Sequence, residues 1–289
     1  SMPVYMLLRG GTYLRPSWGQ PRNDPLGFAP KMIDHNHGST GICGPAIYDA
    51  PQFPAEYRDS LFLCNPVNGK VHWDKLNSIG SSRFVETQPD FITCTDPWFR
   101  PVDAAVGPDG ALYIADFYNA IIGHYEVELE HPKRDRTHGR VWRIRYQGDG
   151  KPLPTHLDLT KHGLKDLINR LGAPNLVTRT LALNYLVDNH GKAAAPAVKK
   201  AMAKGNGELV AYGMWALERT GGLSDDMLGK LSKGGEILPR IFAMKILAER
   251  RALTSFHQNL VLSGLQDVDP TTRRSAADAL TRHLLPHSV

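Results

Sequence analysis

Apolar and polar residues alternate in short runs along the first half of the chain. Turn residues such as Asn68-Gly69 and Pro108-Asp109-Gly110 separate the runs. Short alternating or apolar runs bounded by turn residues are typical of antiparallel sheets. The predicted strands cover residues 45–50, 60–64, 70–74, 111–116, 120–127 and 140–146. The first ~40 residues are rich in Gly, Pro and Asn and are predicted to form loops.

The pattern changes in the second half, where four segments share a small residue followed four positions later by Leu. Residues four apart lie on one face of a helix, and a small residue there lets a neighbouring helix approach closely. The small residues are Ala182, Gly213, Ala243 and Ala276. Because a shorter helical segment precedes each one, residues 160–289 are predicted to form four helix pairs in an α-solenoid. The units resemble HEAT repeats, although they are shorter than the usual ~40 residues.

Composition and charge divide the chain at the same place. Residues 1–159 contain 16 Lys or Arg and 18 Asp or Glu, whereas residues 160–289 contain 18 and 11. We therefore predict a β-rich domain over residues 1–150 and a helical domain over residues 160–289, joined by a linker near 148–154. The basic surplus of the second domain is typical of a solvated helical surface. Because no nucleic-acid motif accompanies it, nucleic acid is not expected as a partner.

The remaining composition narrows the class of protein. Hydrophobic residues make up 42% of the chain, enough for a sizeable core. No run of about 18 apolar residues predicts a membrane span, and no secretory signal is visible at the N-terminus. The cysteines Cys43, Cys64 and Cys94 lack the spacing of zinc sites and of c-type haem attachment. Two arrangements of the cysteines stay open: one disulfide with one free thiol, or three buried thiols.

Two segments of the first half combine specific motifs: "ICGPAIYDAPQFPAEYRDSLFLCNPVNGKV" (42–71) and "DPWFRPVDAAVGPDGALYIADFYNAIIGHYEV" (96–127). They resemble late blades of the glucose/sorbosone dehydrogenase β-propeller, and "RDRTHGRVWRI" resembles its closing edge strand. The order of domains is similar to that of bacterial proteins identified as membrane-bound dehydrogenases, which join this propeller to HEAT-like repeats. A closed propeller needs at least about four blades. The strands over residues 42–146 are therefore expected to form a partial β-propeller, its last two or three blades.

The resemblance implies a six-bladed fold with its chemistry at the mouth of the central channel. There, pyrroloquinoline quinone (PQQ) and calcium would oxidise a sugar hydroxyl, a histidine would accept its proton, and arginines and a lysine would hold the quinone carboxylates. Arg100 and Asp103 keep register with an Arg-x-Arg-Asp motif of the family, but Val102 replaces the second Arg and the lysine position falls near Val67. The catalytic histidine belongs to an early blade outside this sequence, so no catalytic residue is assigned.

The stretch "RPVDAAVGPDGALYIADFYN" (100–119) contains the main candidate residues. Arg100 precedes a Pro and is predicted either to bind an anion or to form an ion pair with Asp103. Asp116 and Asn119 flank an aromatic pair at a strand end, where propellers bind ligands. Asp109 is predicted to belong to the turn before this strand.

Histidines offer weaker candidates. In the loop "DHNHGSTG", His35 and His37 could ligate a metal, His37 could contact a substrate, or both could make ordinary loop hydrogen bonds. His124 is expected to be packed inside the fold, and the basic loop 131–140 to be solvated.

We therefore expect a multidomain β + α protein that is part of a quinone-linked dehydrogenase oxidising a sugar or polyol, and that is catalytically incomplete in this chain. Whether the chain is itself an enzyme stays open. The alternative is a non-enzymatic binding or scaffold module whose solenoid docks a partner protein, which Val102 and Val67 favour. A third interpretation is a split dehydrogenase whose missing propeller half is another chain. By resemblance, the setting is periplasmic or exported.

Overall fold

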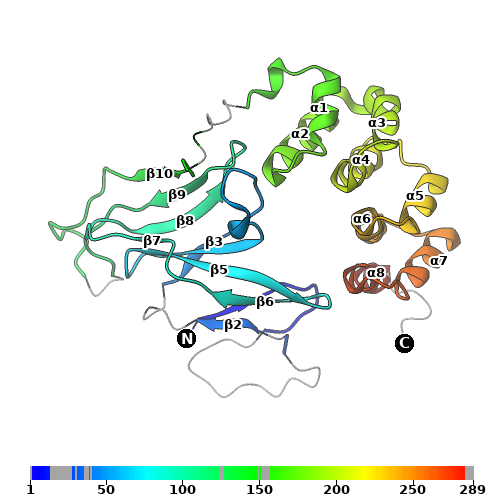
Figure 1. Cartoon of the computed structure of the whole chain (residues 1–289). Helices are drawn as coiled ribbons and strands as arrows, with labels where there is room; N and C mark the ends of the chain where they lie inside the picture. Colours follow the sequence, from blue (N-terminus) through cyan, green and yellow to red (C-terminus); the bar gives the residue numbers. More distant parts are fainter. Residues whose placement is uncertain are drawn as a thin grey trace. The chain divides into compact units, whose positions relative to one another are not determined.

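The chain folds into two compact units, Ser1–Thr155 and His156–Val289. Figure 1 shows strands in the first unit and helices in the second, which confirms the predicted combination of β and α structure. The structure is a computed structural model that describes residues 2–13, 28–29, 31–35, 39, 41–123, 127–148, 150 and 157–283.

The larger sheet of the first unit is an antiparallel meander in the order β3-β4-β5-β6, with the short strand β7 paired to β5. Its strands are β3 (Cys43–Tyr48), β4 (Ser60–Asn65), β5 (Lys70–Ile79), β6 (Ser82–Thr87) and β7 (Ile92–Thr93), with a 3-10 turn at Ala55–Tyr57. All six residues of β4 are buried, because this strand has a neighbour on both sides and packed residues on both faces. The apolar run in the sequence is therefore a central strand.

A second antiparallel sheet has the order β10-β9-β8, from β8 (Pro101–Val106), β9 (Leu112–Asp116) and β10 (Arg140–Ile144). Its core residues Leu112 and Ile114 pack with Phe62 and Tyr48 of the larger sheet, and all four side chains are fully buried. The Tyr48 hydroxyl donates to the Gly110 carbonyl at 2.7 Å and so joins the two sheets at the β8–β9 turn.

The predicted strands at 45–50, 60–64, 70–74, 111–116 and 140–146 all overlap strands of the structure. The strand predicted at 120–127 is wrong over its described residues, which form a loop. The expectation of loops at the N-terminus is wrong in part, since β1 (Met2–Tyr5) and β2 (Lys31–His35) pair as a two-stranded sheet. Within the described residues, the sheets do not close into a barrel or propeller.

The second unit contains pairs of helices. They are α1 (Leu164–Arg170), α2 (Leu176–His190), α3 (Ala195–Met202), α4 (Gly207–Arg219), α5 (Asp225–Ser232), α6 (Ile237–Glu249), α7 (Ser255–Gly264) and α8 (Pro270–His283). Short 3-10 turns lie at Leu159–Lys161 and Gly191–Ala194. In Figure 1, α2, α4, α6 and α8 form one row and the odd-numbered helices form a second row beside it. No described helix is long and apolar enough to span a membrane.

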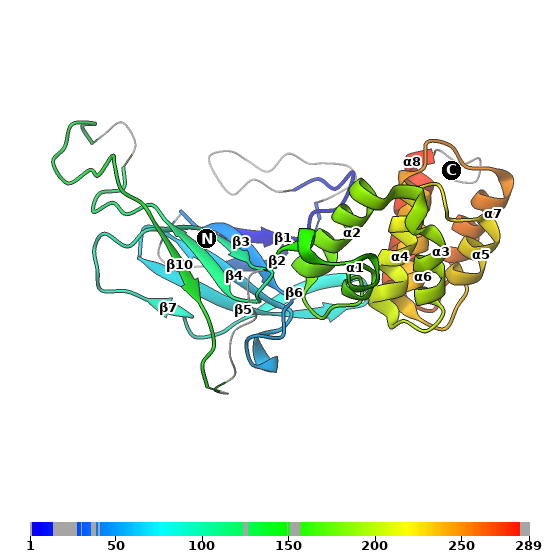
Figure 2. The same cartoon turned by 90° about the horizontal axis from the view of Figure 1, so that it is seen from above.

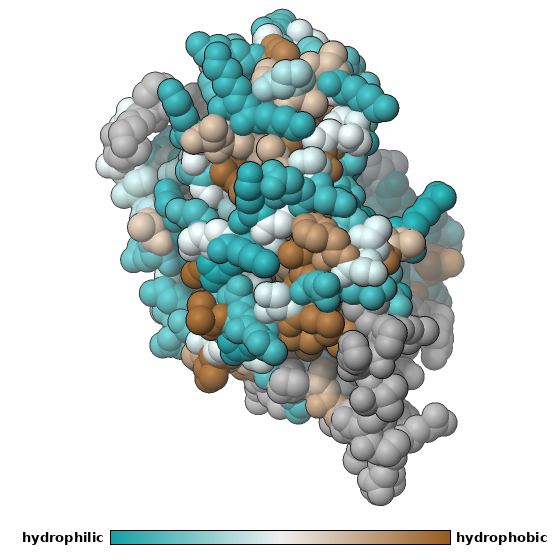
Figure 3. Space-filling model, turned by 90° about the vertical axis from the view of Figure 1, so that its right-hand side faces the viewer, coloured by the Kyte–Doolittle hydropathy of each residue, from teal (hydrophilic) through white to brown (hydrophobic). Residues whose placement is uncertain are grey.

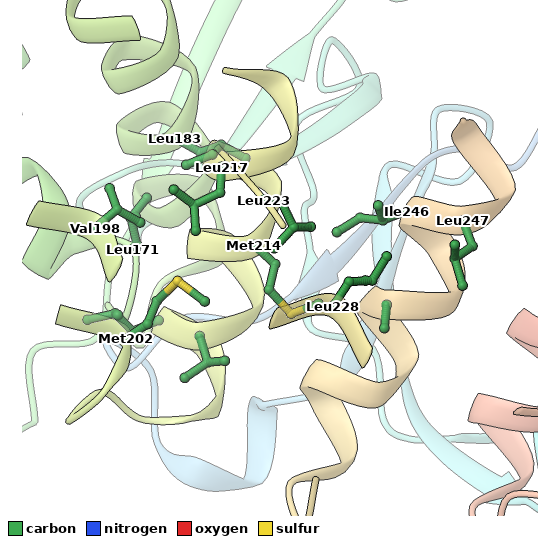
Figure 4. Packing of buried hydrophobic residues seen from close by; sticks show 14 of the residues in the cluster. Leu171, Leu183, Val198, Met202, Met214, Leu217, Leu223, Leu228, Ile246 and Leu247 are labelled. Carbon is green, nitrogen blue, oxygen red and sulfur yellow. The ribbon is translucent and has the colours of Figure 1, made fainter. Parts of the chain in front are cut away.

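The small residues of the repeated pattern lie where neighbouring helices meet. Ala182, Ala243 and Ala276 are fully buried, and a Cβ added at Gly213 would come within 2.8 Å of Met202. Leu, Met, Ile and Val side chains from successive helices fill the space between the rows, as Figure 4 shows. The repeat in the sequence is therefore a repeat of close helix contacts.

Three helices of the even-numbered row share an arginine with the same contact. Arg179, Arg240 and Arg273 each stand three positions before the small residue. Through Nη1, each donates to a backbone carbonyl five or six residues earlier, at 2.6–3.0 Å. The recurring arginine thus ties each helix to the loop that precedes it.

Candidate functional site

Asp116, the last residue of β9, holds the end of the smaller sheet together. Its buried carboxylate accepts four hydrogen bonds: Oδ1 accepts from the backbone N–H groups of Arg100 and Tyr118, both at 2.9 Å, and Oδ2 from Arg140 Nε at 2.7 Å and Trp142 Nε1 at 2.9 Å. Burial by itself would raise the pKa of Asp116. The hydrogen bonds outweigh it and hold this pKa below its ordinary value, so the carboxylate is ionised.

Arg140 extends this arrangement to a second carboxylate. Its Nη1 and Nη2 donate to Asp96 Oδ2, both at 3.1 Å. Its guanidinium lies over the Tyr118 ring, 4.1 Å from the centroid, and 5.2 Å from the centroid of Trp142. A cation held between two carboxylates and two aromatic rings is fixed in place and is not available to a ligand.

Arg100 makes contacts of a different kind. Its side chain donates to the backbone carbonyls of Asn119 at 2.7 Å, Pro66 at 3.0 Å, Ala120 at 3.0 Å and Val67 at 3.2 Å. Burial lowers the pKa of Arg100, and the charges of Asp116 and Asp96 oppose this shift in part. Asp103 is exposed on β8. Arg100 therefore joins the β4–β5 turn to the segment after β9. Because the Arg100 side chain binds the carbonyls of residues 119 and 120, these carbonyls do not pair with a neighbouring strand. The chain forms a loop here, although a strand was predicted from residue 120.

Asn119 is the predicted site residue with unused hydrogen-bonding capacity. It is 2% exposed, and its Nδ2 donates to the Asp135 carbonyl at 2.9 Å. Its Oδ1 is buried and has no partner among the described residues. A buried acceptor left without a donor costs ~1–3 kcal/mol, so such an atom marks a place where a donor is missing.

A cavity of about 460 Å³ lies beside Asn119. It is formed by the long loop between β9 and β10, which projects beyond the strands in Figure 2. Phe117, 54% exposed, contributes an aromatic face, and His138, Asp135 and Arg134 contribute polar groups. Six of the eight lining residues are polar or charged, and Phe117 and Leu129 are the apolar ones, so the cavity suits a polar ligand that also offers an apolar face.

The polar wall of the cavity is a preorganised turn. Asp135 Oδ1 accepts from the backbone N–H groups of Thr137 and His138, both at 2.8 Å, and Oδ2 accepts from His138 Nδ1 at 2.7 Å. The Thr137 amide, together with the His138 contacts, lowers the pKa of Asp135 to about 2. Because an ionised carboxylate can only accept, His138 Nδ1 donates to Asp135, which fixes the orientation of the imidazole ring on this wall.

The structure brings together three of the five residues predicted to bind a cofactor or substrate. Arg100, Asp116 and Asn119 meet at the end of β9, whereas Asp103 lies on the exposed side of β8 and does not line the cavity. His35 is in β2, with its side chain outside the described residues, and His37 and His124 also lie outside them.

Sequence reasoning missed most of the partners of these residues. Arg140 and Trp142 reach Asp116 from 24 and 26 positions away, and only their i, i+2 spacing on one strand face hinted at it. The basic loop expected to be solvated provides His138 and Asp135 to the cavity. Asp109 does cap the turn through the Ala111 amide, but it also pairs with Arg143 Nε at 2.8 Å.

The arrangement does not fit the cofactor that the resemblance implies. An arginine that holds a quinone carboxylate needs free N–H groups, and the Arg100 side chain makes four hydrogen bonds to carbonyls. Val67 and Val102 offer no charge in its place. Among the described residues, no group of three or more His, Cys, Asp or Glu side chains could hold a metal ion. The Arg100 side chain as it lies here therefore does not serve to hold a quinone carboxylate.

Comparison with known protein families finds a similarity in the first half of the chain. Residues 18–148 match the model of a family described as a domain of unknown function, DUF7133. The match covers most of the β unit and includes Arg100, Asp116 and Asn119. No curated protein matches the chain.

Proposed function

We propose that the β unit binds a sugar or polyol and belongs to a dehydrogenase-like protein, to which this chain contributes an incomplete catalytic apparatus. The observation that carries the proposal is the buried, unpartnered Oδ1 of Asn119 beside the cavity. This oxygen has almost no accessible surface, so the Asn119 side chain would turn toward the cavity for a ligand hydroxyl group to donate to it and satisfy it. The His138 ring, held by Asp135 through Nδ1, offers a second polar group on the same wall, so a compound with several hydroxyl groups suits the cavity best.

Phe117 supports the same class of ligand. Its ring is 54% exposed at the cavity, and an apolar ring face packs well against the C–H face of a sugar. The motifs that resemble the dehydrogenase propeller point independently to hydroxyl compounds. The exported or periplasmic setting stays part of the proposal through that resemblance.

The finer architecture is also a proposal. We infer that the β3–β6 meander is one blade of a propeller and that β8–β10 belong to the last blade, since a blade is a four-stranded antiparallel sheet. We likewise infer that the helix pairs are an α-solenoid, because each even-numbered helix packs on the next one along a row.

The test is a titration of the full chain with D-glucose and D-sorbitol, followed by calorimetry and ligand-observed NMR. We expect binding that Asn119→Ser and Phe117→Ala each weaken at least about tenfold, which corresponds to the loss of about 1.4 kcal/mol. Val141→Ala is the matched control, because Val141 is 73% exposed on β10 and does not line the cavity. Binding that survives both cavity variants would contradict the proposal.

A non-enzymatic scaffold is the second candidate. It is favoured by the structural use of Arg100, which removes the most specific candidate for a cofactor contact. Figure 3 shows small groups of hydrophobic residues among hydrophilic ones on one face of the molecule, which gives no indication of a particular partner. Failure of both polyols to bind the folded chain would favour the scaffold.

A further inference from the structure

Two of the three cysteines lie opposite each other in the larger sheet. Cys43 of β3 and Cys64 of β4 are register partners of an antiparallel pair. Register partners in such a pair have Cα atoms about 4.5–5.5 Å apart, and disulfides span Cα distances of about 4.4–6.8 Å. The register shifts between Cys43 and Ala46, but Cys43 and Cys64 remain partners beside this irregularity, so we infer that their backbones lie in the range that a disulfide spans.

The two side chains also share one face of the sheet. Cys64 is fully buried in the cluster that contains Phe62 and Ile114, and Cys43 packs against the same cluster. Cys94 is exposed in the segment after β7 and is not part of this pair.

We propose that Cys43 and Cys64 form a disulfide between β3 and β4 when the protein meets a small-molecule disulfide. This inference rests on strand register and packing and does not depend on the proposed ligand. The sequence left two arrangements of the cysteines open. The proposal chooses one of them, a disulfide between Cys43 and Cys64 with Cys94 as the free thiol.

Exchange would begin at Cys43, because it is partly exposed whereas Cys64 is not. The Cys43 thiol loses its proton, and its sulfur attacks one sulfur of the small disulfide and expels the other as a thiolate. Cys64 then loses its proton, attacks Cys43 Sγ and releases the second thiolate. Two protein thiols are oxidised to one disulfide, one small disulfide is reduced to two thiols, and the two protons are accepted by the released thiolates.

Burial should make this exchange slow at neutral pH. Desolvation raises the pKa of Cys64 to about 12 and, together with Asp103, raises that of Cys43. The thiolate is the attacking species, so the rate should increase with pH. Refolding in the presence of the oxidant removes the barrier that burial imposes.

The test uses the full chain refolded with glutathione disulfide, alkylated with N-ethylmaleimide and digested without reduction. We expect mass spectrometry to find one peptide pair linked through Cys43 and Cys64, with Cys94 alkylated. The link closes a loop of about 20 residues, so oxidation should raise the melting temperature of the β unit by about 5–10 °C.

Two variants keep the test decisive. Cys94→Ser should leave the linked peptides and the thermal shift unchanged, whereas Cys43→Ser, at a half-buried position, should remove both. Alkylation of both Cys43 and Cys64 after oxidative refolding would overturn the proposal. A link that includes Cys94, or a melting temperature lowered by oxidation, would also overturn it.

Discussion

Trp142 Nε1 donates to Asp116 Oδ2 at 2.9 Å, so an edge strand and its neighbour are joined through a buried carboxylate. Arg140 donates to the same oxygen, and two backbone amides donate to Oδ1. Every donor in this group faces an acceptor, and the acceptor is ionised. Asp116, predicted from the sequence to contact a ligand, therefore supports the site and does not offer the ligand a free group.

Replacing this carboxylate by an amide should be costly. Asp116→Asn turns one side of the group into a donor that faces other donors, and we expect the β unit to lose about 2–4 kcal/mol of unfolding free energy. Urea unfolding followed by Trp fluorescence measures it, because four of the five Trp lie before residue 160. Asp103→Asn, at an exposed position on β8, should change stability by less than about 0.5 kcal/mol. Equal effects of the two variants would contradict this account.

Arg100 should behave as a structural residue. Lysine carries the same charge but cannot reach four carbonyls that diverge around a planar guanidinium. We therefore expect Arg100→Lys to cost about 2–3 kcal/mol of stability, with little further loss for Arg100→Ala. If Arg100→Lys retained full stability and altered only polyol binding, Arg100 would instead belong to the binding site.

The β unit should lose stability in acid for the same reason. The pKa values of Asp116, Asp109 and Asp90 are lowered in the folded state by their hydrogen bonds and cationic partners, despite burial. An unfolded Asp has a pKa of about 3.9, so the stabilisation is complete above that value and is lost as the pH falls through the lower folded values. Urea midpoints should therefore be constant between about pH 6 and 7 and fall below about pH 4. Asp116→Asn should show a smaller fall.

The sequence allowed most strands to be located, but it did not allow the hydrogen-bond partners of the site residues to be identified. Alternation and turn residues located β9, because its pattern and the turn before it are local properties of residues 108–116. The partners of the site residues are not local: Arg140 and Asp96 meet across 44 positions, and Arg100 reaches Pro66 across 34. At residues 120–123 the local pattern predicted a strand, but the structure has a loop. Their apolar pattern favours a strand, yet the Arg100 side chain takes the carbonyls of Asn119 and Ala120, where this strand would begin.

Gly44 is expected to be intolerant of any side chain. Its φ is +57°, and a Cβ there would come within 2.5 Å of the Asp103 Cα and 2.8 Å of the Val102 carbonyl oxygen, both backbone atoms. Gly44→Ala should therefore separate β3 from β8 and lower the stability of the β unit by more than about 2 kcal/mol. Gly10→Ala is the matched control, because Gly10 has a φ of +71° with open space around it, and its cost should be only the backbone strain, about 1 kcal/mol. Similar costs for the two variants would show that strain alone matters at Gly44.

Arg240 offers the sharpest test of the helical unit. It is 8% exposed, and it pairs with Asp267 through Nε at 2.9 Å and Nη2 at 3.1 Å while Nη1 holds the Gly234 and Gly235 carbonyls. Arg240→Met leaves a nearly buried carboxylate without its cation, so we expect a loss of about 3–5 kcal/mol. Far-UV circular dichroism during urea unfolding measures it, since the helices lie in this unit.

A second substitution separates the pair from the packing around it. In Arg240→Met/Asp267→Leu both charges are gone, and we expect the double variant to recover at least half of the loss, because the main cost of the single variant is the unpaired charge. Arg219→Met, at an exposed arginine that reaches Asn184, should cost less than about 1 kcal/mol. If the double variant is no more stable than Arg240→Met, the bonds outside the ion pair are the larger contribution: those from Arg240 to the Gly234 and Gly235 carbonyls and the one from the Asp269 amide to Asp267 Oδ1.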